Sequence, residues 1–217
     1  MENGTVSFTL LEMFRLGGVF MWPLLAFSIA TITIGLERTI YLIYHNLKID
    51  DLGRKTAELL AERDYQGAAD YLSGQTQRRM GARILLALVN RAMPGKAFSE
   101  HHVERAAETE AMICISSLEK GFNFLVALGS LSPLTGFLGT VSGMIGAFKS
   151  IAEATEVNAQ IVANGIYEAL ITTVCGLVIA IVAMIFHSVF THIVNTFTSN
   201  VEKTCSDLIA DITDQQQ

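Results

Sequence analysis

Three long stretches of the chain contain no Asp, Glu, Lys or Arg, and they limit its possible folds more than any other feature. The stretches cover residues 16–36, 121–148 and 169–201, and they hold 21, 28 and 33 residues. A helix of about 20 apolar residues is long enough to cross the hydrocarbon core of a bilayer. Because 51% of the residues are hydrophobic and the mean hydropathy is +0.41, the sequence predicts a membrane protein with three transmembrane helices.

The third stretch is too long for one crossing and too short for two crossings with a turn. We therefore expect the helix to continue beyond the membrane into water. The predicted fold class is an all-α integral membrane protein, with three transmembrane helices and long helices that extend into the cytoplasm.

The distribution of basic residues predicts the orientation. Residues 45–120 contain 11 of the 15 Lys and Arg residues, and basic loops stay on the cytoplasmic side of a membrane. The predicted segments are an amphipathic surface helix at 1–17, transmembrane helix 1 at 18–44, a cytoplasmic helical domain at 45–120, transmembrane helix 2 at 121–148, a short external connection at 149–162, transmembrane helix 3 at 163–190 and a cytoplasmic carboxyl-terminal helix at 191–217. The amino terminus is expected outside and the carboxyl terminus inside.

Short helices are expected within the cytoplasmic domain. Asp50 and Asp51 are predicted caps of its first helix. Helix breakers divide the remainder at Gly67, Gly74, Gly81 and the Pro94-Gly95 pair. From Ser99 onward no breaker occurs until Gly121, so we expect a single helical rod that continues into the second transmembrane helix.

The residue pattern argues against several classes of function. The cytoplasmic domain has no phosphate-binding loop, no metal-ligand cluster and no nucleophile with a base, so no catalytic residue, metal or cofactor is predicted, and an enzyme is not expected. The basic residues do not gather on one helix face, which argues against a nucleic-acid partner. Cys114, Cys175 and Cys205 have neither a disulfide pattern nor metal-type spacing and are interpreted as small apolar side chains.

A line of glycines marks the second transmembrane segment. Gly136, Gly139, Gly143 and Gly146 follow a spacing of 3, 4 and 3 residues and so lie on one helix face. Small residues let helix backbones approach closely within a membrane, so this face is predicted to pack against another helix. Pro133 frees the carbonyl near Gly129 and predicts a kink or an irregular turn.

Polar residues in the second and third segments suggest an ion pathway. Glu168 stands at the start of a long apolar run, and helical spacing places Thr172 and Cys175 on its side of the helix, with Thr140 beside the glycine face of the other segment. An intramembrane carboxylate is costly unless it faces protein or water. The opposite face is aliphatic, and its members are Leu170, Val174, Leu177 and Ile181. The alternatives are that Glu168 reaches the outer interface and that Thr140 bonds the preceding turn of its own helix.

These residues stand in motifs that resemble the MotA/TolQ/ExbB family of ion-channel motor subunits. The first segment carries Gly17-Gly18, Met21-Trp22-Pro23-Leu24-Leu25 and Leu36-Glu37-Arg38. The second carries the run from Pro133 to Ile145, and the third carries Gly165-Ile166-Tyr167-Glu168-Ala169-Leu170-Ile171-Thr172-Thr173 followed by Gly176-Leu177. One span before the large loop, rather than two, makes the layout similar to ExbB and TolQ.

The resemblance implies a place and partners. It implies a homopentamer in the bacterial inner membrane, with the amino terminus in the periplasm, around two copies of a single-span protein similar to ExbD or TolR. A membrane aspartate of that partner is the expected ion carrier, and a protein similar to TonB or TolA is a further expected partner. Thr140, Glu168 and Thr173 match positions that line the interior, and Pro133 matches a proline at the entry of the second span. Gly176 is expected to take part in helix packing. Ion flow is then converted into mechanical work, with no cofactor besides the transported ion.

Two departures from the family pattern leave alternatives open. Val182 stands where many members have a proline, which removes the reason to expect a hinge there. The pair Thr172-Thr173 resembles the threonine pair of sodium-driven stators, whose oxygens are suited to bind a desolvated sodium ion. The ion therefore stays open between H⁺, favoured by the ExbB/TolQ layout, and Na⁺. A rotary or gliding stator and a non-conducting membrane scaffold are the alternative functions.

Overall fold

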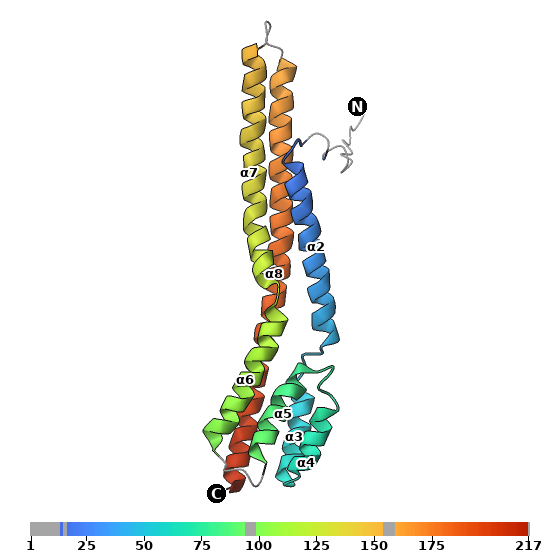
Figure 1. Ribbon diagram of the computed structural model, residues 1–217, viewed down its shortest axis with the longest axis vertical. Coiled ribbons are helices and arrows are strands. Elements are labelled where there is room, and N and C mark those ends of the chain that lie inside the picture. The colour runs from blue at the N-terminus through green and yellow to red at the C-terminus, as the bar shows by residue number, and fades with distance from the viewer. Residues whose placement is uncertain (1–13, 15–16, 94–98, 154–158, 217) are drawn as a thin grey trace, which may run out of the picture. The chain divides into compact units, whose positions relative to one another are not determined.

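The computed structural model describes residue 14 and residues 17–93, 99–153 and 159–216, and all regular structure in this part is α-helical. In chain order the helices are α2 (Met21–Tyr44), α3 (Asp50–Ala61), α4 (Tyr65–Ser73), α5 (Met80–Ala92), α6 (Glu100–Glu119), α7 (Phe122–Glu153) and α8 (Ala159–Gln216) (Figure 1). The surface helix predicted at residues 1–17 falls almost wholly on residues outside this description.

Three helical stretches in the described residues are long and apolar enough to cross a membrane, as the charge-free segments predict. They are Met21–Tyr44, Glu100–Glu153 and Ala163–Asp214. The 58 residues of α8 correspond to about 87 Å at 1.5 Å per residue, about three times the thickness of the hydrocarbon core. The expectation that the third apolar stretch continues as a helix beyond one crossing is confirmed.

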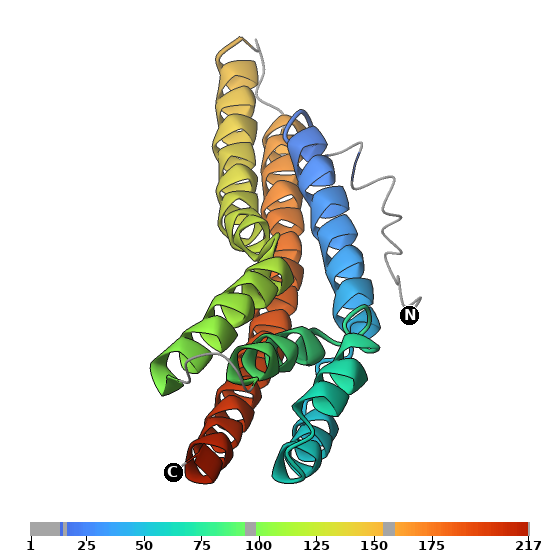
Figure 2. The same ribbon diagram turned by 60° about the horizontal axis from the view of Figure 1, so that its bottom comes forward.

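The chain divides into two compact units, and the first consists of residues 1–36 and 122–188. Within it, α8 lies between α2 and α7 in both views (Figure 1, Figure 2). Met21 and Leu24 of α2 pack with Ile171 of α8 in a buried cluster. Gly35 of α2 also faces the ring of Phe186, because a Cβ at Gly35 would lie 2.6 Å from a carbon of that ring.

The outward faces of this unit are apolar. Leu170, Val174, Leu177 and Ile181 of α8 are each about half exposed or more in the isolated chain, so the predicted aliphatic face is confirmed. Trp22 is also exposed, at the beginning of α2. Exposed aliphatic side chains of this kind are suited to contact with lipid or with neighbouring membrane helices.

The second unit consists of residues 37–121 and 189–217. In it α5 packs against α4 and α6, and α3 packs against α4. Ile49, Leu52, Leu60, Leu72, Ile84, Leu85, Leu88 and Leu118 are fully buried and form much of its apolar core. Arg83 of α5 pairs with Glu110 of α6 at 2.6 Å.

The expected positions of the helix breaks in this unit are partly wrong. Gly67 lies inside α4, where its amide donates to the Asp64 side chain at 2.8 Å, and Gly81 lies in the first turn of α5. The chain turns instead at Arg63, which has a φ of 59°. The break predicted at Gly74 is confirmed, because Gly74 is the C-cap of α4 and the turn continues to Arg79. The break predicted at Pro94-Gly95 lies outside the described residues. Side chains and tertiary contacts cap the free backbone amides and carbonyls at helix ends, so a glycine need not end a helix.

The predicted caps of the first short helix are also displaced. Ile49 is the N-cap of α3 and gives no side-chain bond, whereas Asp50 and Asp51 are the first two helical residues. Carboxylates in the first turn are favourable there because the helix N-terminus carries a partial positive charge.

The single rod expected from Ser99 into the membrane is interrupted. α6 ends at Glu119 and α7 begins at Phe122, with Gly121 between them at a φ of 93°. That left-handed conformation suits glycine and breaks the helical hydrogen-bond pattern. The break lies at the first residue of the charge-free second segment.

Glu37 and Arg38 form an ion pair near the end of α2. The guanidinium contacts the carboxylate through Nε at 2.5 Å and Nη2 at 2.6 Å. Its Nη1 donates to the carbonyl of Ser117, in the last turn of α6, at 3.2 Å, and the group lies 4.9 Å from the centre of the Tyr41 ring. A cation near a helix C-terminus is stabilising, so Arg38 anchors α2 to α6 within the second unit.

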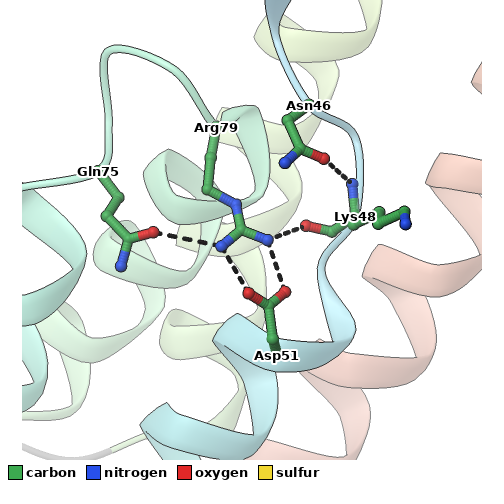
Figure 3. Close-up of polar contacts among 5 residues, drawn as sticks. All are labelled: Asn46, Lys48, Asp51, Gln75 and Arg79. Carbon is green, nitrogen blue, oxygen red and sulfur yellow. Dashed lines mark hydrogen bonds and ion pairs between the residues drawn. The ribbon is translucent and has the colours of Figure 1, made fainter.

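Arg79 joins three chain segments of the second unit (Figure 3). Its guanidinium donates to both carboxylate oxygens of Asp51, at 2.5 and 2.7 Å, to the carbonyl of Lys48 at 2.8 Å and to Gln75 at 3.2 Å. A bidentate arginine–carboxylate pair fixes direction as well as distance. Arg79 therefore holds the connection after α2 against the beginnings of α3 and α5.

We expect Asp51→Asn to lower the free energy of unfolding by about 1 kcal/mol near pH 7, because the carboxylate is half exposed and water weakens the pair. Hydrogen bonding from Arg79 is the main reason why the pKa of the Asp51 carboxyl lies below its ordinary value of 3.8. The stabilisation is thus present above pH 3.8 and is lost as the pH falls through the lowered pKa. Denaturant unfolding in mild detergent, followed by circular dichroism at decreasing pH, measures the difference.

Asp50→Asn is the matched control, because it removes a carboxylate from the same helical turn and leaves the bonds between Asp51 and Arg79 in place. Equal destabilisation by the two substitutions would contradict the role assigned to this pair.

Candidate functional site

The packing of α7 against α8 depends on residues with little or no side chain. The buried residues Ser132, Gly136, Gly139, Gly143 and Ala147 follow one another at intervals of three or four along α7. Their α8 neighbours are Gly165, Ala169, Thr172, Thr173 and Gly176.

The two backbones are in direct contact at this interface. A Cβ on Gly136 would lie 2.7 Å from the carbonyl oxygen of Thr172, and one on Gly143 would lie 2.9 Å from the carbonyl oxygen of Gly165. A Cβ on Gly176 would lie 2.5 Å from the carbonyl oxygen of Ser132. Such close approach is the way in which membrane helices associate without large apolar side chains.

Gly146 does not belong to this interface. It is exposed, and no described atom lies within 4 Å of the place its Cβ would take. Ala147 continues the interface instead, because the observed intervals from Gly136 onward are 3, 4 and 4, whereas those of the glycines are 3, 4 and 3. Packing of Gly146 against a helix of another chain stays a prediction.

Pro133 stands inside α7, which runs continuously from Phe122 to Glu153. The neighbouring Ser132 hydroxyl donates to the carbonyl of Leu128 at 2.6 Å and is fully buried. Gly129, whose carbonyl the proline leaves without its usual amide partner, packs against the thioether of Met184. The helix accommodates the proline at a point where a small residue and a flexible one meet.

The carbonyl oxygen of Gly136 lies near the hydroxyls of the two adjacent α8 threonines, Thr172 and Thr173. The Thr172 hydroxyl lies 3.2 Å from it and 2.8 Å from the carbonyl of Ala169, and the Thr173 hydroxyl lies 3.5 and 3.4 Å from the same two oxygens. Thr172 is only 1% exposed, whereas Thr173 is partly buried.

Thr140 stands one turn after Gly136 on α7. Its hydroxyl donates to the carbonyl of Phe137 at 2.7 Å. The structure thus has the bond to the preceding turn of its own helix that was the alternative for this residue. All three threonine hydroxyls therefore have acceptors within the chain.

Glu168 lies apart from this group of hydroxyls. Its carboxylate lies against Gly18, at the beginning of α2, and the side chain is partly buried. Glu168 precedes Ile171 by one turn, and Ile171 packs on Met21 and Leu24 of the same α2 helix. The carboxylate is therefore held at the α2 side of α8, while Thr172 faces α7.

The polar residues predicted to share one face of α8, Glu168, Thr172 and Cys175, contact two different helices, α2 and α7. Cys175 packs against the apolar cluster of Met21, Leu24 and Ile171, and Thr172 is enclosed at the α7 interface. Glu168, Thr172 and Cys175 consequently do not share one open face within a single subunit. A helical wheel places them on one side of α8 but cannot show that two different helices cover that side.

The other two cysteines are buried thiols of the second unit. Burial raises the pKa of Cys114 to about 11 and that of Cys205 to about 12. A thiol that stays protonated is a weak nucleophile and a poor metal ligand, which agrees with their interpretation as small apolar side chains.

Comparison with known proteins decides the family. The family model of the MotA/TolQ/ExbB proton channel family matches residues 75–203, a stretch that contains α5, α6, α7 and most of α8. The chain belongs to this family. The match includes every threonine of the site, Glu168 and the whole α7–α8 interface.

Individual relatives agree with this assignment. The putative biopolymer transport protein ExbB-like 3 of Synechocystis sp. is 33% identical over 177 residues, which are 80% of this chain and 81% of that protein. The biopolymer transport protein ExbB of Salmonella typhimurium is 28% identical over 155 residues, 69% of this chain and 64% of that protein. The Tol-Pal system protein TolQ of Haemophilus influenzae is 43% identical over 74 residues, 34% of this chain and 32% of that protein.

Two contacts of this family member are not predicted from its sequence. Gly18 appears there only as part of a glycine pair, and its contact with Glu168 joins residues 150 positions apart. The contact of Arg79 with Asp51 also joins residues far apart in the sequence and is not predicted from it.

Proposed function

We propose that the chain is the ion-conducting subunit of an inner-membrane energy-transducing motor, similar in role to ExbB and TolQ. The observation that carries the proposal is Glu168, a partly buried carboxylate that precedes a 33-residue stretch without another charge and lies against Gly18, just before α2. Keeping a carboxylate at this place costs free energy, and an ion pathway is the use for which membrane proteins retain such groups.

Thr140, Thr172 and Thr173 are the other residues that we assign to the pathway. Thr140 and Thr173 are only partly buried, so a second subunit or a partner helix has access to them. Thr172 acts through position, because its enclosed hydroxyl holds α8 at the Gly136 carbonyl.

The subunit is proposed to work as a homopentamer around two copies of a single-span protein similar to ExbD or TolR, with a protein similar to TonB or TolA receiving the work. Two features support association. In one chain Glu168 lies at the α2 side of α8 and Thr172 lies at the α7 side, so a single subunit does not enclose an ion path lined by both. Met112 and Ile113 of α6 are 63% and 49% exposed in the part of the chain that we place in the cytoplasm, where apolar surface favours contact with a neighbour.

The multi-pass inner-membrane location follows from the three apolar helices and the family. We propose further that the amino terminus is periplasmic and the carboxyl terminus cytoplasmic, since residues 45–120 contain most of the Lys and Arg residues. The second unit, with its charged surface and helices α3 to α6, then lies in the cytoplasm.

Protons are the ion that we propose. The Thr172 hydroxyl already donates within the chain and is closed off from solvent, so it is poorly placed as a ligand of a desolvated sodium ion. A titrating carboxylate and a chain of water molecules are sufficient for protons. The alternative is a sodium-driven or rotary stator, for which the Thr172-Thr173 pair is the supporting feature.

A sodium titration distinguishes these two ions. With pH fixed and membrane potential clamped, we expect the work output of the assembled motor to be flat across sodium concentrations, and Thr172→Ala to change the amount of assembled complex more than its ion dependence. The measurement is energy-dependent transport in cells that contain the partner. A saturable sodium response that disappears in Thr172→Ala would contradict the choice of protons.

A non-conducting membrane scaffold is the second candidate function. The observation in its favour is that the hydroxyls of Thr140, Thr172 and Thr173 all have carbonyl acceptors inside the subunit. Under that hypothesis Glu168 is also a packing residue, and its removal weakens assembly instead of ion flow.

A further inference from the structure

The contact between Gly18 and Glu168 is unusually close. A Cβ built on Gly18 would overlap the carboxylate oxygen Oε1 of Glu168 and would lie 2.8 Å from its Cδ. Real Cβ atoms do not approach a neighbour so closely, so a residue with a Cβ at this position would force the end of the Glu168 side chain to move.

The backbone of Gly18 adds a second, independent requirement for glycine. Its φ is 66°, in the left-handed region that glycine adopts without steric cost. This conformation leads directly into α2, because the amide of Met21 donates to the carbonyl of Gly18 at 3.3 Å. Gly18 therefore makes both the left-handed turn before α2 and the contact with Glu168.

The neighbouring packing fixes the register of this contact. Met21 and Leu24 follow Gly18 by three and six positions, Ile171 follows Glu168 by three, and these apolar residues pack together in a buried cluster. The beginning of α2 and the turn of α8 that contains Glu168 are thus held against each other, and this fixes the position of the carboxylate.

We propose that Gly18 is a positioning residue for Glu168. Its bare Cα leaves room for the extended glutamate side chain, and this sets the depth and direction of the carboxylate along the ion pathway. The inference rests on the proposed function, in which Glu168 takes part in ion flow. It adds that the position of the carboxylate, and not only its presence, is set by a residue 150 positions earlier in the chain.

The test is a double-mutant cycle with two substitutions. We expect Gly18→Ala to lower ion flux through the reconstituted complex at least about tenfold, because a displacement of about 1 Å at a reacting group can cost up to a hundredfold. Glu168→Asp alone also lowers the flux, because the side chain is one methylene shorter and its carboxylate no longer reaches the position beside Gly18. In the double variant the shorter side chain leaves room for the new methyl group, so we expect Gly18→Ala to lower the flux by no more than about threefold when Glu168→Asp is already present.

Gly121→Ala is the control for backbone strain, because Gly121 also has a positive φ, of 93°. We expect Gly121→Ala to change the flux by the same factor with and without Glu168→Asp. Native mass spectrometry of each variant measures the amount of assembled complex, and the flux is expressed per assembled complex.

The outcomes separate this inference from the proposed function. If Glu168→Ala keeps normal flux, the proposed function fails. If Glu168→Ala loses flux while Gly18→Ala keeps it, or while Gly18→Ala lowers the flux by the same factor with and without Glu168→Asp, the proposed function stands and the positioning role of Gly18 is overturned.

Discussion

Glu168→Ala is expected to abolish energy-dependent transport in cells, with a loss of at least about a hundredfold, while the subunit still folds and assembles. The carboxylate opens the long uncharged stretch of α8 and contacts Gly18 without filling the apolar cluster beside it. Replacing Glu168 by Ala therefore removes an ionisable group but few packing contacts. An intramembrane carboxylate that contributes little to packing is expected to have a role in function. Transport assays at equal amounts of membrane protein measure the loss.

The assembly state of this variant provides the control. We expect native mass spectrometry in mild detergent to find the same oligomer for wild type and Glu168→Ala, with five copies of the chain. A stable wild-type monomer would contradict the channel proposal. If Glu168→Ala failed to assemble and Glu168→Gln restored both assembly and transport, the role of this side chain would be structural.

Gly176→Ala is expected to destabilise the subunit by about 2 kcal/mol, within the range for overpacked interiors. The new methyl group would lie 2.5 Å from the carbonyl oxygen of Ser132 and 3.3 Å from the Cα of Gly136, so two helix backbones must separate to admit it. Thermal unfolding in mild detergent, followed by circular dichroism, measures the change.

Gly146→Ala is the matched control for this substitution. It adds the same methyl group to α7 at a place with open space within the subunit, and alanine is favoured over glycine in helices by up to about 1 kcal/mol. We expect it to leave the stability of the subunit unchanged or slightly raised. A destabilisation equal to that of Gly176→Ala would contradict the packing described for α7 and α8.

Much of the fold can be predicted from the sequence, because charge-free length is a direct consequence of bilayer thickness. The three apolar helices, the extension of α8 beyond one crossing and the exposed face of Leu170, Val174, Leu177 and Ile181 all follow from that relation. The motifs around Pro133 and Glu168 also lead to the correct family.

The details that sequence reasoning missed depend on contacts between distant segments. Gly121, the first helix breaker after Ser99, interrupts the expected rod because it adopts a left-handed conformation, whereas Gly129 and Gly136 further along stay helical. Ala147, and not Gly146, lies in the interface because the position of α8 beside α7 decides which face is buried, and the spacing of glycines alone does not. The Arg79 contacts join loops whose approach depends on the packing of α3 to α5.

The candidate site shows the same limit. A helical wheel correctly groups Glu168 with Thr172, yet α2 and α7 each cover a different part of that side, so the carboxylate and the hydroxyl have different neighbours. The positions of residues along one helix are a local property, whereas access to water and ions depends on which helices pack beside it.

The central claim, that this chain conducts ions through a path that needs Glu168, is tested most directly by flux into liposomes that contain only the chain and its single-span partner. Under an imposed proton gradient we predict proton flux well above that of empty liposomes for the wild-type complex and background flux for Glu168→Ala at equal amounts of assembled complex. Wild-type flux no greater than that of empty liposomes, or equal flux in the two complexes, would contradict the account.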